Sequence, residues 1–217
     1  MTAPYLAVIF DMDGVLVDTE MAFFGAVNEI LLPTGKQVAW NDYKQLLGTS
    51  VDVTRVKLVE MLELDGNADD FFRGFNELLV KRLAEPREPL PDTEAVLDAL
   101  SSRQIPYALA TSSTRVWKQT VLTSAGLQDR FPIAVTADDL THMKPAPDIY
   151  LKAAELLSMP PERCIAVEDT IPGIASAKAA GMYAIQVRAS STALPPIDEA
   201  DAVIDTLEQF PFDLLAT

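Results

Sequence analysis

The sequence predicts an α/β protein with a doubly wound parallel sheet and a helical segment inserted after its first strand. Beyond residue 91, short apolar runs alternate with segments of helical periodicity, as expected when a crossover helix follows each strand. The runs are continuously apolar, which is typical of strands covered by helices on both faces. Residues 19 to 85 show little strand signal, and their apolar residues recur at helical spacing.

The first element is the apolar run at residues 6–10, LAVIF, which we assign to the same sheet because one strand alone is not stable. Three stretches of helical periodicity follow: MAFFGAVNEILL, VTRVKLVEMLEL and DDFFRGFNELLVKRL. Three prolines between residues 86 and 91 then interrupt helix formation and favour a stiff connector. We therefore predict a core domain of residues 1–18 and 89–217 and a helical domain of residues 19–88.

The second half of the chain predicts five more strands, each preceded by a helix or turn: PYALA, PIAVT, CIAV, YAIQV and ADAVID. The intervening predicted helices include TRVWKQTVLTSAG and PGIASAKAAG, which end at Gly126 and Gly181 and therefore predict left-handed C-caps. Asp92 precedes the helix at residues 93–103 and is expected to be its N-cap. The segment TLEQFPFDLL is expected to form a last helix.

The composition argues against several function classes. The 17 Lys and Arg residues against 32 Asp and Glu residues give a net charge of -15, which would repel the backbone of DNA or RNA. No apolar run approaches the roughly 20 residues that span a bilayer, so we expect no membrane association. The N-terminal residues lack the basic region of a signal peptide, so the expected compartment is the cytoplasm.

Two further expectations concern association and redox state. Cys164 is the one cysteine, which excludes an internal disulfide, and its apolar neighbours predict a buried thiol. The sequence shows no heptad or sheet-edge signal for self-association, so we expect a monomer.

Polar residues follow the first predicted strand at the edge where open parallel sheets bind ligands. Asp11 and Asp13 leave this strand at a spacing of two, so both side chains point to the same side, and Gly14 permits a sharp turn. Carboxylates so close together need a cation, and Mg²⁺ fits because it prefers oxygen ligands. An isolated Asp-x-Asp-Gly is typical of an ordinary turn. The prediction of a site therefore depends on the other strand ends.

Three other strand ends carry complementary groups. Thr111 and Ser112 offer a hydroxyl and backbone amides that suit a phosphate oxygen, although a helix N-cap would use them too. Lys144 lies in a proline-rich loop that can direct its ammonium group at a phosphate, whereas a lone loop lysine is usually solvated. Glu168 and Asp169 supply carboxylates, and a favourable helix dipole accounts for one such charge better than for two.

Four segments, DMDGVLVDTE, ALATSS, MKPAPDIY and VEDTIPGIASAKAAGM, together resemble the motifs of the haloacid dehalogenase superfamily, in order, over residues 8 to 182. The VLVDTE extension and the position of the helical insertion resemble the β-phosphoglucomutase and sugar-phosphate phosphatase branch. The resemblance implies a Rossmann-like core with a small helical cap, Mg²⁺ as cofactor and a small phosphate ester as substrate.

The resemblance also implies roles for the matched residues. Asp11 would attack phosphorus to form an aspartyl phosphate, and Asp13 would act as general acid and then as base for water. An acid at position 13 argues against the dehalogenase members. The implied Mg²⁺ ligands are Asp11, the Asp13 backbone carbonyl and Asp169, with Glu168 acting through water. The implied phosphate-binding residues are Thr111, Ser112 and Lys144.

Two positions depart from the mutase pattern. Phe23 replaces a histidine that assists transfer to the sugar, and Val51 replaces an arginine that grips the distal phosphate. Arg73 lines up with a mutase lysine, so Thr19 and Arg73 are our candidates for substrate selection, although Arg73 could equally be a solvated helix residue. We therefore predict a phosphatase acting on a small phosphate monoester, such as a sugar phosphate. One alternative is a phosphosugar mutase. The other is a non-enzymatic binding module, and the intact acidic residues and Lys144 argue against this second alternative.

The sequence of the helical insertion does not identify the alcohol that carries the phosphate. We expect most of its aromatic residues to pack in the interior, although some could line a pocket: Phe23, Phe24, Trp40, Phe71, Phe72 and Phe75. His142 is interpreted as an incidental loop residue. The proline-rich segment 86–91 and the stretch near Thr19 are expected to be hinges through which the cap closes over the substrate.

Overall fold

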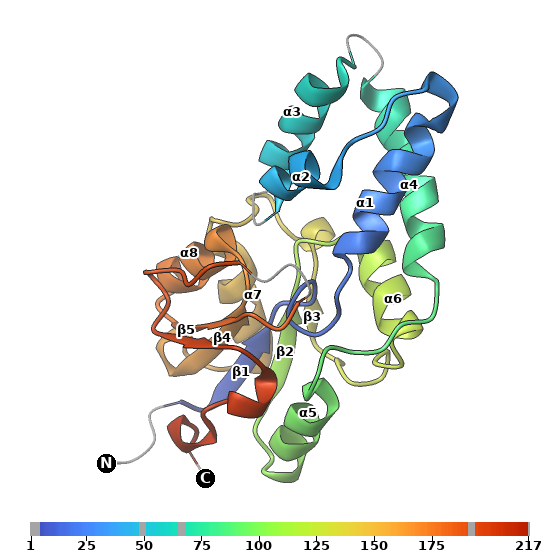
Figure 1. The fold of residues 1–217 in the computed structure, drawn as a ribbon. Helices are drawn as coiled ribbons and strands as arrows, with labels where there is room; N and C mark the ends of the chain where they lie inside the picture. The colour runs from blue at the N-terminus through green and yellow to red at the C-terminus, as the bar shows by residue number, and fades with distance from the viewer. Residues whose placement is uncertain (1–4, 48–50, 65–67, 191–193, 217) are drawn as a thin grey trace.

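The computed structural model describes residues 5–47, 51–64, 68–190 and 194–216. Six parallel strands form one sheet in the order β3-β2-β1-β4-β5-β6 (Figure 1). The strands are β1 (Ala7–Phe10), β2 (Tyr107–Ala110), β3 (Ala134–Val135), β4 (Cys164–Glu168), β5 (Tyr183–Val187) and β6 (Ala202–Ile204). The predicted parallel α/β fold is therefore confirmed, and β1 lies in the middle of the sheet.

Residues of β1 alternate between two apolar layers, and all four are fully buried. Val8 and Phe10 join the cluster that includes helices α5 and α6, whereas Ala7 and Ile9 pack with α7 and α8. Burial on both faces explains the continuously apolar strand sequences. These helices are α5 (Thr93–Ser102), α6 (Arg115–Ser124), α7 (Asp148–Leu157) and α8 (Ile171–Ala179).

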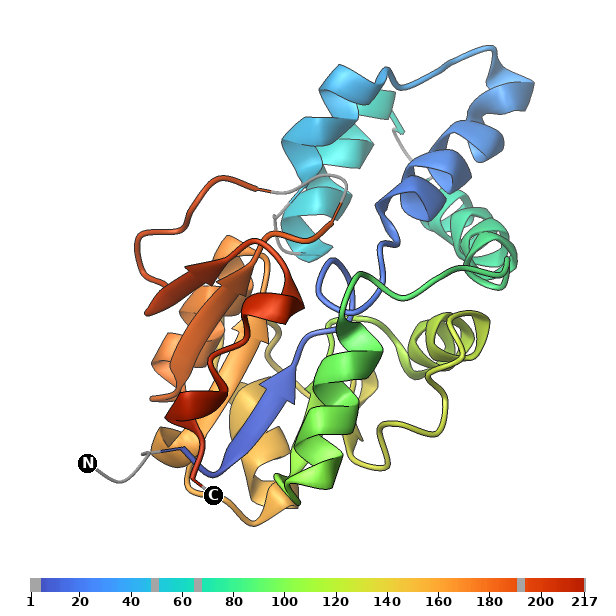
Figure 2. The same cartoon turned by 60° about the horizontal axis from the view of Figure 1, so that its bottom comes forward.

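Four further helices, which we call the cap helices, follow β1 and lie over the carboxyl ends of the strands (Figures 1 and 2). They are α1 (Glu20–Leu31), α2 (Trp40–Tyr43), α3 (Val51–Leu62) and α4 (Ala68–Leu83). Helices α1 and α4 lie side by side and bury apolar residues that include Val27, Phe75 and Leu79. None of the described helices is long and apolar enough to cross a membrane.

Two chain segments connect the cap helices to the remainder, and Arg87 of the segment after α4 contacts the segment before α1 and the last turn of α4. Its guanidinium donates to the carbonyl oxygen of Asp18 at 3.3 Å and to that of Arg82 at 2.8 Å. It also donates to the Ser124 hydroxyl at 3.2 Å, at the end of α6. One cation therefore joins the segment before α1, the segment after α4 and a helix that packs on the sheet.

Glycines occupy the backbone positions that the sequence assigns to turns. Gly126 and Gly181 have φ values of 72° and 81°, so the predicted left-handed C-caps are confirmed. Gly14 has a φ of 78° in the turn after Asp13. Cys164 is buried, as predicted.

Two local predictions fail, one in part and one fully. Asp92 is the N-cap residue of α5, as predicted, but its backbone is left-handed, with a φ of 66°, and its side chain makes no capping hydrogen bond. The segment TLEQFPFDLL forms two short 3₁₀ helices, Leu207–Gln209 and Phe212–Leu214, in place of one helix. Pro211 lies between them, and a proline lacks the N–H that a continuous helix needs.

Candidate active site

The ends of β1 and β4 are neighbours in the sheet, and Lys144 joins the acids that follow them. Its ammonium nitrogen lies 2.5 Å from Asp11 Oδ1 and 2.5 Å from Glu168 Oε1, and it donates to the Ala110 carbonyl oxygen at 3.1 Å. Only 7% of Lys144 is exposed. This lysine is therefore not the solvated loop residue that an isolated reading of its sequence would favour.

Burial and charge act in opposite directions on this pair. Burial raises the pKa of Asp11 to about 7, although the neighbouring Lys144 works against the shift. Burial lowers the pKa of Lys144, but attraction to Asp11 and Glu168 outweighs it and the net shift is upward. Lys144 therefore stays protonated at neutral pH and favours the ionised form of Asp11.

Glu168 is fully buried and has both carboxylate oxygens occupied. Besides Lys144, the Tyr150 hydroxyl donates to Oε1 at 3.0 Å, while the backbone N–H groups of Asp169 and Thr170 donate to Oε2. A Cβ on Gly173 would lie 2.0 Å from Oε1, so only glycine fits there. Our sequence reading overlooked Tyr150 and Gly173, although both lie inside the quoted motifs. Glu168 thus anchors Lys144.

Asp11, Glu168 and Asp169 form the group that could hold a metal ion. Each offers a carboxylate oxygen, and these atoms lie within 4.8 Å of one another. Asp169 Oδ1 is buried and has no hydrogen-bond partner. A Cβ on Gly14 would lie 2.0 Å from Asp169 Oδ2, so the glycine lets the Asp-x-Asp-Gly turn approach this carboxylate. An all-oxygen donor set with an unpaired buried oxygen fits a hard divalent cation.

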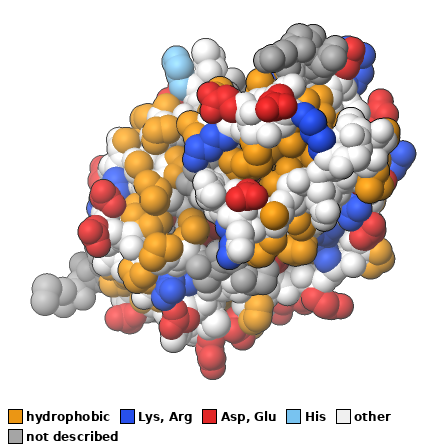
Figure 3. All heavy atoms as spheres, turned by 45° about the horizontal axis from the view of Figure 1, so that its top comes forward, with side chains coloured by type: hydrophobic (Ala, Val, Ile, Leu, Met, Phe, Trp, Pro, Cys, Tyr) orange, Lys and Arg blue, Asp and Glu red, His pale blue; other side chains and the backbone are white. Residues whose placement is uncertain are grey.

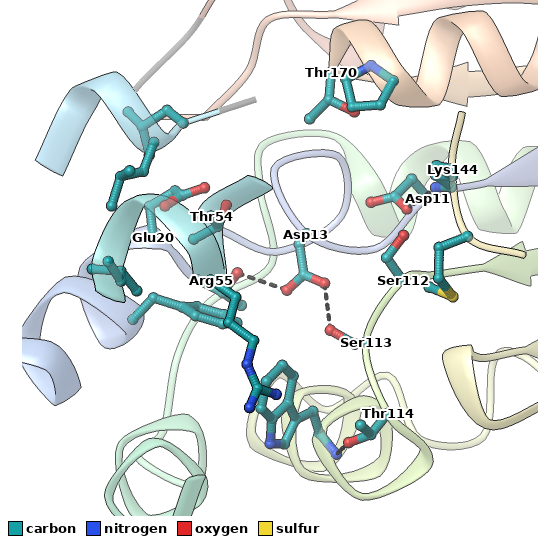
Figure 4. A pocket seen from close by; sticks show the side chains of 18 of the residues that line it. Asp11, Asp13, Glu20, Thr54, Arg55, Ser112, Ser113, Thr114, Lys144 and Thr170 are labelled. Carbon is teal, nitrogen blue, oxygen red and sulfur yellow. Dashed lines mark hydrogen bonds and ion pairs between the residues drawn. The ribbon is translucent and has the colours of Figure 1, made fainter. Parts of the chain in front are cut away.

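Three hydroxyl groups hold the Asp13 carboxylate by hydrogen bonds. Thr19 donates to Oδ1 at 2.6 Å, and Ser113 and Thr111 donate to Oδ2 at 2.9 and 3.4 Å. Figure 4 shows Asp13 pointing toward Ser113, with Asp11 and Lys144 beside each other. Burial raises the pKa of Asp13, and these hydrogen bonds oppose that shift. Ser113 directly follows the predicted Thr111 and Ser112, but its residue type alone does not distinguish it from Ser112.

A cavity of about 450 Å³ lies between the strand ends and the cap helices. Its lining includes six of the predicted site residues: Asp11, Asp13, Thr19, Ser112, Lys144 and Asp169. Thr111 and Glu168 are fully buried beneath it and do not line it. The candidate carboxylates and hydroxyls therefore reach one cavity or support the groups that do.

Arg73 lies away from this cavity. Its side chain is 72% exposed and pairs with Asp70 at 3.0 Å, which matches a solvated helix residue. Arg55 of α3 lines the cavity in its place and lies 4.5 Å from the ring of Phe72. Residues 48–50 and the side chain of Val51, where the sequence lacks the mutase arginine, lie outside the described residues.

The cap aromatic residues divide into two groups. Phe23, Phe72 and Phe75 line the cavity. Phe24 packs against Trp40, with ring centroids 4.9 Å apart, and Phe71 is buried. Interior packing therefore accounts for only some of these rings, and position in sequence did not separate them. His142 is exposed and lies 3.0 Å from Asp148.

Known proteins resemble the chain over nearly its whole length. The model of the haloacid dehalogenase-like hydrolases matches residues 8–187. The fructose-1-phosphate phosphatase of Escherichia coli is 33% identical, covering 85% of this chain and 97% of its own. The phosphorylated carbohydrates phosphatase of Thermotoga maritima is 32% identical, covering 82% and 83%.

A solved structure is also similar. That of β-phosphoglucomutase from Clostridium difficile has a TM-score of 0.81 and 25% identity, and covers 96% of this chain and 94% of its own. The fold and the predicted resemblance are both confirmed. The chain belongs to the haloacid dehalogenase-like hydrolases.

Proposed function

We propose that this protein is a Mg²⁺-dependent phosphatase that hydrolyses a small phosphate monoester, such as a sugar phosphate, through an aspartyl phosphate. The observation that carries the proposal is the meeting of Lys144 with Asp11 and Glu168 at 2.5 Å, in a cavity that Asp13 also lines. This arrangement supports the proposal because a nucleophile, a positive charge and a proton donor would all be needed near the same phosphate. The names of the relatives agree with a phosphoric monoester hydrolase.

Each residue has a part in the proposed reaction. An oxygen of Asp11 attacks phosphorus, and the bond from phosphorus to the ester oxygen breaks. Asp13 gives its proton to the departing alcohol and then accepts a proton from the water that attacks the aspartyl phosphate. Release of inorganic phosphate restores Asp11. Lys144 and Ser112 are placed to contact the phosphoryl oxygens, while Thr111 supports Asp13 from beneath.

Asp11 and Asp169, with the backbone carbonyl of Asp13, would hold Mg²⁺, and Glu168 would act through water. The ion would supply positive charge for the phosphoryl oxygens. Both this charge and that of Lys144 are needed because the protein carries a net charge of -15.

We further propose that residues 19–88 are a cap domain on a core of residues 1–18 and 89–217. Closure would exclude water while Asp11 attacks, and Arg87 would link the two hinge segments. A disulfide engineered to hold the cap closed should slow turnover, whereas an unchanged rate would contradict the gating. The cytoplasm and a monomeric state stay predictions.

The test is phosphate release from a panel of sugar phosphates, phosphoglycolate and an aryl phosphate, in Mg²⁺ or EDTA. Asp11→Asn should abolish release, while Asp129→Asn, an exposed acid, serves as the matched control. We expect release only in Mg²⁺ and only with Asp11 intact. Faster interconversion of hexose 1- and 6-phosphates than phosphate release would favour a mutase, although Phe23 lines the cavity where mutases use histidine. No turnover by folded, Mg²⁺-loaded protein would favour a binding module.

A further inference from the structure

Aromatic rings from three helices meet on the cap side of the cavity. Phe23 of α1 lies edge-on to Trp117 of α6, with ring centroids 5.5 Å apart and an angle of 87°. Phe75 of α4 lies 6.4 Å from Phe23 and 6.4 Å from Phe72. All four rings line the cavity. Phe75 is buried, whereas Phe23, Phe72 and Trp117 keep part of their surface uncovered.

Aliphatic residues extend this apolar wall. Leu46, Leu47 and Leu58 also line the cavity and come from the segment around α3. Figure 3 looks onto the cap side and shows hydrophobic side chains gathered on this face, with charged side chains around them. The alcohol part of a bound phosphate ester would therefore meet mainly rings and methyl groups.

The charged groups of this wall are poorly suited to a second phosphate. Arg55 pairs with Asp69 at 2.9 Å and lies over the Phe72 ring, so it would have to share or give up these contacts to bind a second phosphate. Glu20 is a carboxylate on the same cavity and would repel a second anion. The hydroxyls of a sugar would also lose water when they pack against rings that cannot accept their hydrogen bonds.

We infer that the preferred substrate is a monophosphate whose alcohol part carries a flat aromatic or heteroaromatic ring, which packs against the uncovered surfaces of Phe23 and Trp117. The inference rests on the proposed function for the position of the phosphate. Flat rings stack on aromatic side chains and gain surface contact that a puckered ring of similar size does not.

The experiment separates binding from turnover. Calorimetry with the Asp11→Asn variant in Mg²⁺ compares benzyl phosphate, cyclohexylmethyl phosphate and glucose 6-phosphate. The first two are primary esters of similar size, and only benzyl phosphate has a flat ring. We expect benzyl phosphate to bind about tenfold more tightly than either of the others, because stacking of one ring contributes about 1.4 kcal/mol, or tenfold in affinity.

Ring-removing variants locate the effect. Phe23→Leu and Trp117→Leu, each made in the Asp11→Asn background, should lower benzyl phosphate affinity about tenfold and leave glucose 6-phosphate affinity unchanged. Phe24→Leu is the matched control, because that ring lies on the same helix but packs against Trp40 and Tyr43. Thermal melts show whether each variant is folded. If one of the two ring-removing variants does not fold, the other still tests the inference.

Several results would overturn the inference. These are equal or tighter binding of glucose 6-phosphate, no binding of any of the three esters, and a benzyl preference that survives both ring substitutions. Failure of the wild-type protein to release phosphate from every ester would instead overturn the proposed function, while the binding comparison would still decide the ring preference.

Discussion

The two ends of the cavity are built in different ways. At the strand ends, polar atoms hold each other at short distances: Lys144 contacts two carboxylates, and three hydroxyls hold Asp13. At the cap end, the described lining consists mainly of rings and aliphatic side chains in contact. A buried hydrogen-bonded network has little freedom to rearrange, whereas apolar packing tolerates substitution of similar volume. We expect the strand ends to set the chemistry and the cap end to set which ester is accepted.

The largest effect should follow removal of the central cation. Lys144→Met leaves Asp11 and Glu168 buried beside each other without their shared positive charge. Such a change in a buried charge pair costs about 3–5 kcal/mol of folding free energy. Loss of a preorganised charge should also lower kcat by on the order of 10²–10³. Urea unfolding and phosphate release measure the two effects.

Lys152→Met is the control for this prediction. Lys152 lies in α7, and its pair with Glu155 is exposed. An exposed pair contributes about 0–1 kcal/mol, and we expect no loss of activity. Equal effects of the two substitutions would show that the strand-end network is not the rigid element.

Substitution of one helix glycine at each end of the cavity tests the two ends against each other. In Gly173→Ala, the new Cβ would lie 1.9 Å from the Glu168 carboxylate carbon, so Glu168 must move and Lys144 with it. We expect a loss of about 1–3 kcal/mol in folding free energy and a marked fall in kcat. In Gly74→Ala of α4, the Cβ meets the end of the Ile30 side chain at 2.8 Å. That side chain can turn aside, and alanine favours a helix by about 1 kcal/mol, so stability should change little.

Thermal melts of both variants measure the change in stability, and steady-state rates measure the change in kcat. A neutral Gly173→Ala together with a damaging Gly74→Ala would reverse the comparison, because it would make the cap the less tolerant end.

The sequence could predict which polar side chains meet at the strand ends because these residues lie at or directly after the ends of strands. The position of Asp11 or Asp169 is fixed once the strand order is known, since parallel strands end at one edge of the sheet. Arg55 and Arg73 show the limit of that reasoning. Both lie on cap helices, yet only Arg55 lines the cavity, because helix packing decides which face turns inward. Periodicity identifies an apolar face but does not say what it packs against.

Glu20 gives a pH-dependent test of the cap end. Burial, followed by repulsion from Asp13 and Asp18, raises the pKa of Glu20 to about 7. A carboxyl whose pKa is higher in the folded state disfavours folding when ionised, so its penalty grows from its unfolded pKa up to about pH 7. Glu20→Gln removes the penalty and should stabilise the protein at pH 8 by about 1–3 kcal/mol, and by less at pH 5.

Melting temperatures in EDTA at both pH values provide the measurement. Glu77→Gln, an exposed residue of α4, is the control and should shift the melting temperature little at either pH. A stabilisation by Glu20→Gln that is equal at pH 5 and pH 8 would rule out a charge effect.

Errors in the fold prediction came from local backbone conformation. At Asp92, composition alone favours an N-cap, since Asp is a common capping residue. A left-handed backbone at that position places the carboxylate where no capping bond forms, and φ cannot be read from residue type. Pro211 is a signal in the sequence against one continuous helix over residues 206–215, and the two 3₁₀ helices lie on either side of it.

The smallest effect should come from relieving the left-handed backbone strain at Asp92, which is distant in sequence from the strand-end acids. A left-handed conformation costs a non-glycine residue about 1 kcal/mol, less for Asp than for most. Asp92→Gly removes that strain and loses no capping bond, but glycine also gains freedom in the unfolded chain. We expect a net gain of about 0.5 kcal/mol in urea unfolding, with kcat and KM unchanged. A loss of stability would mean that the Asp92 carboxylate supports α5 through the helix dipole despite the absent hydrogen bond.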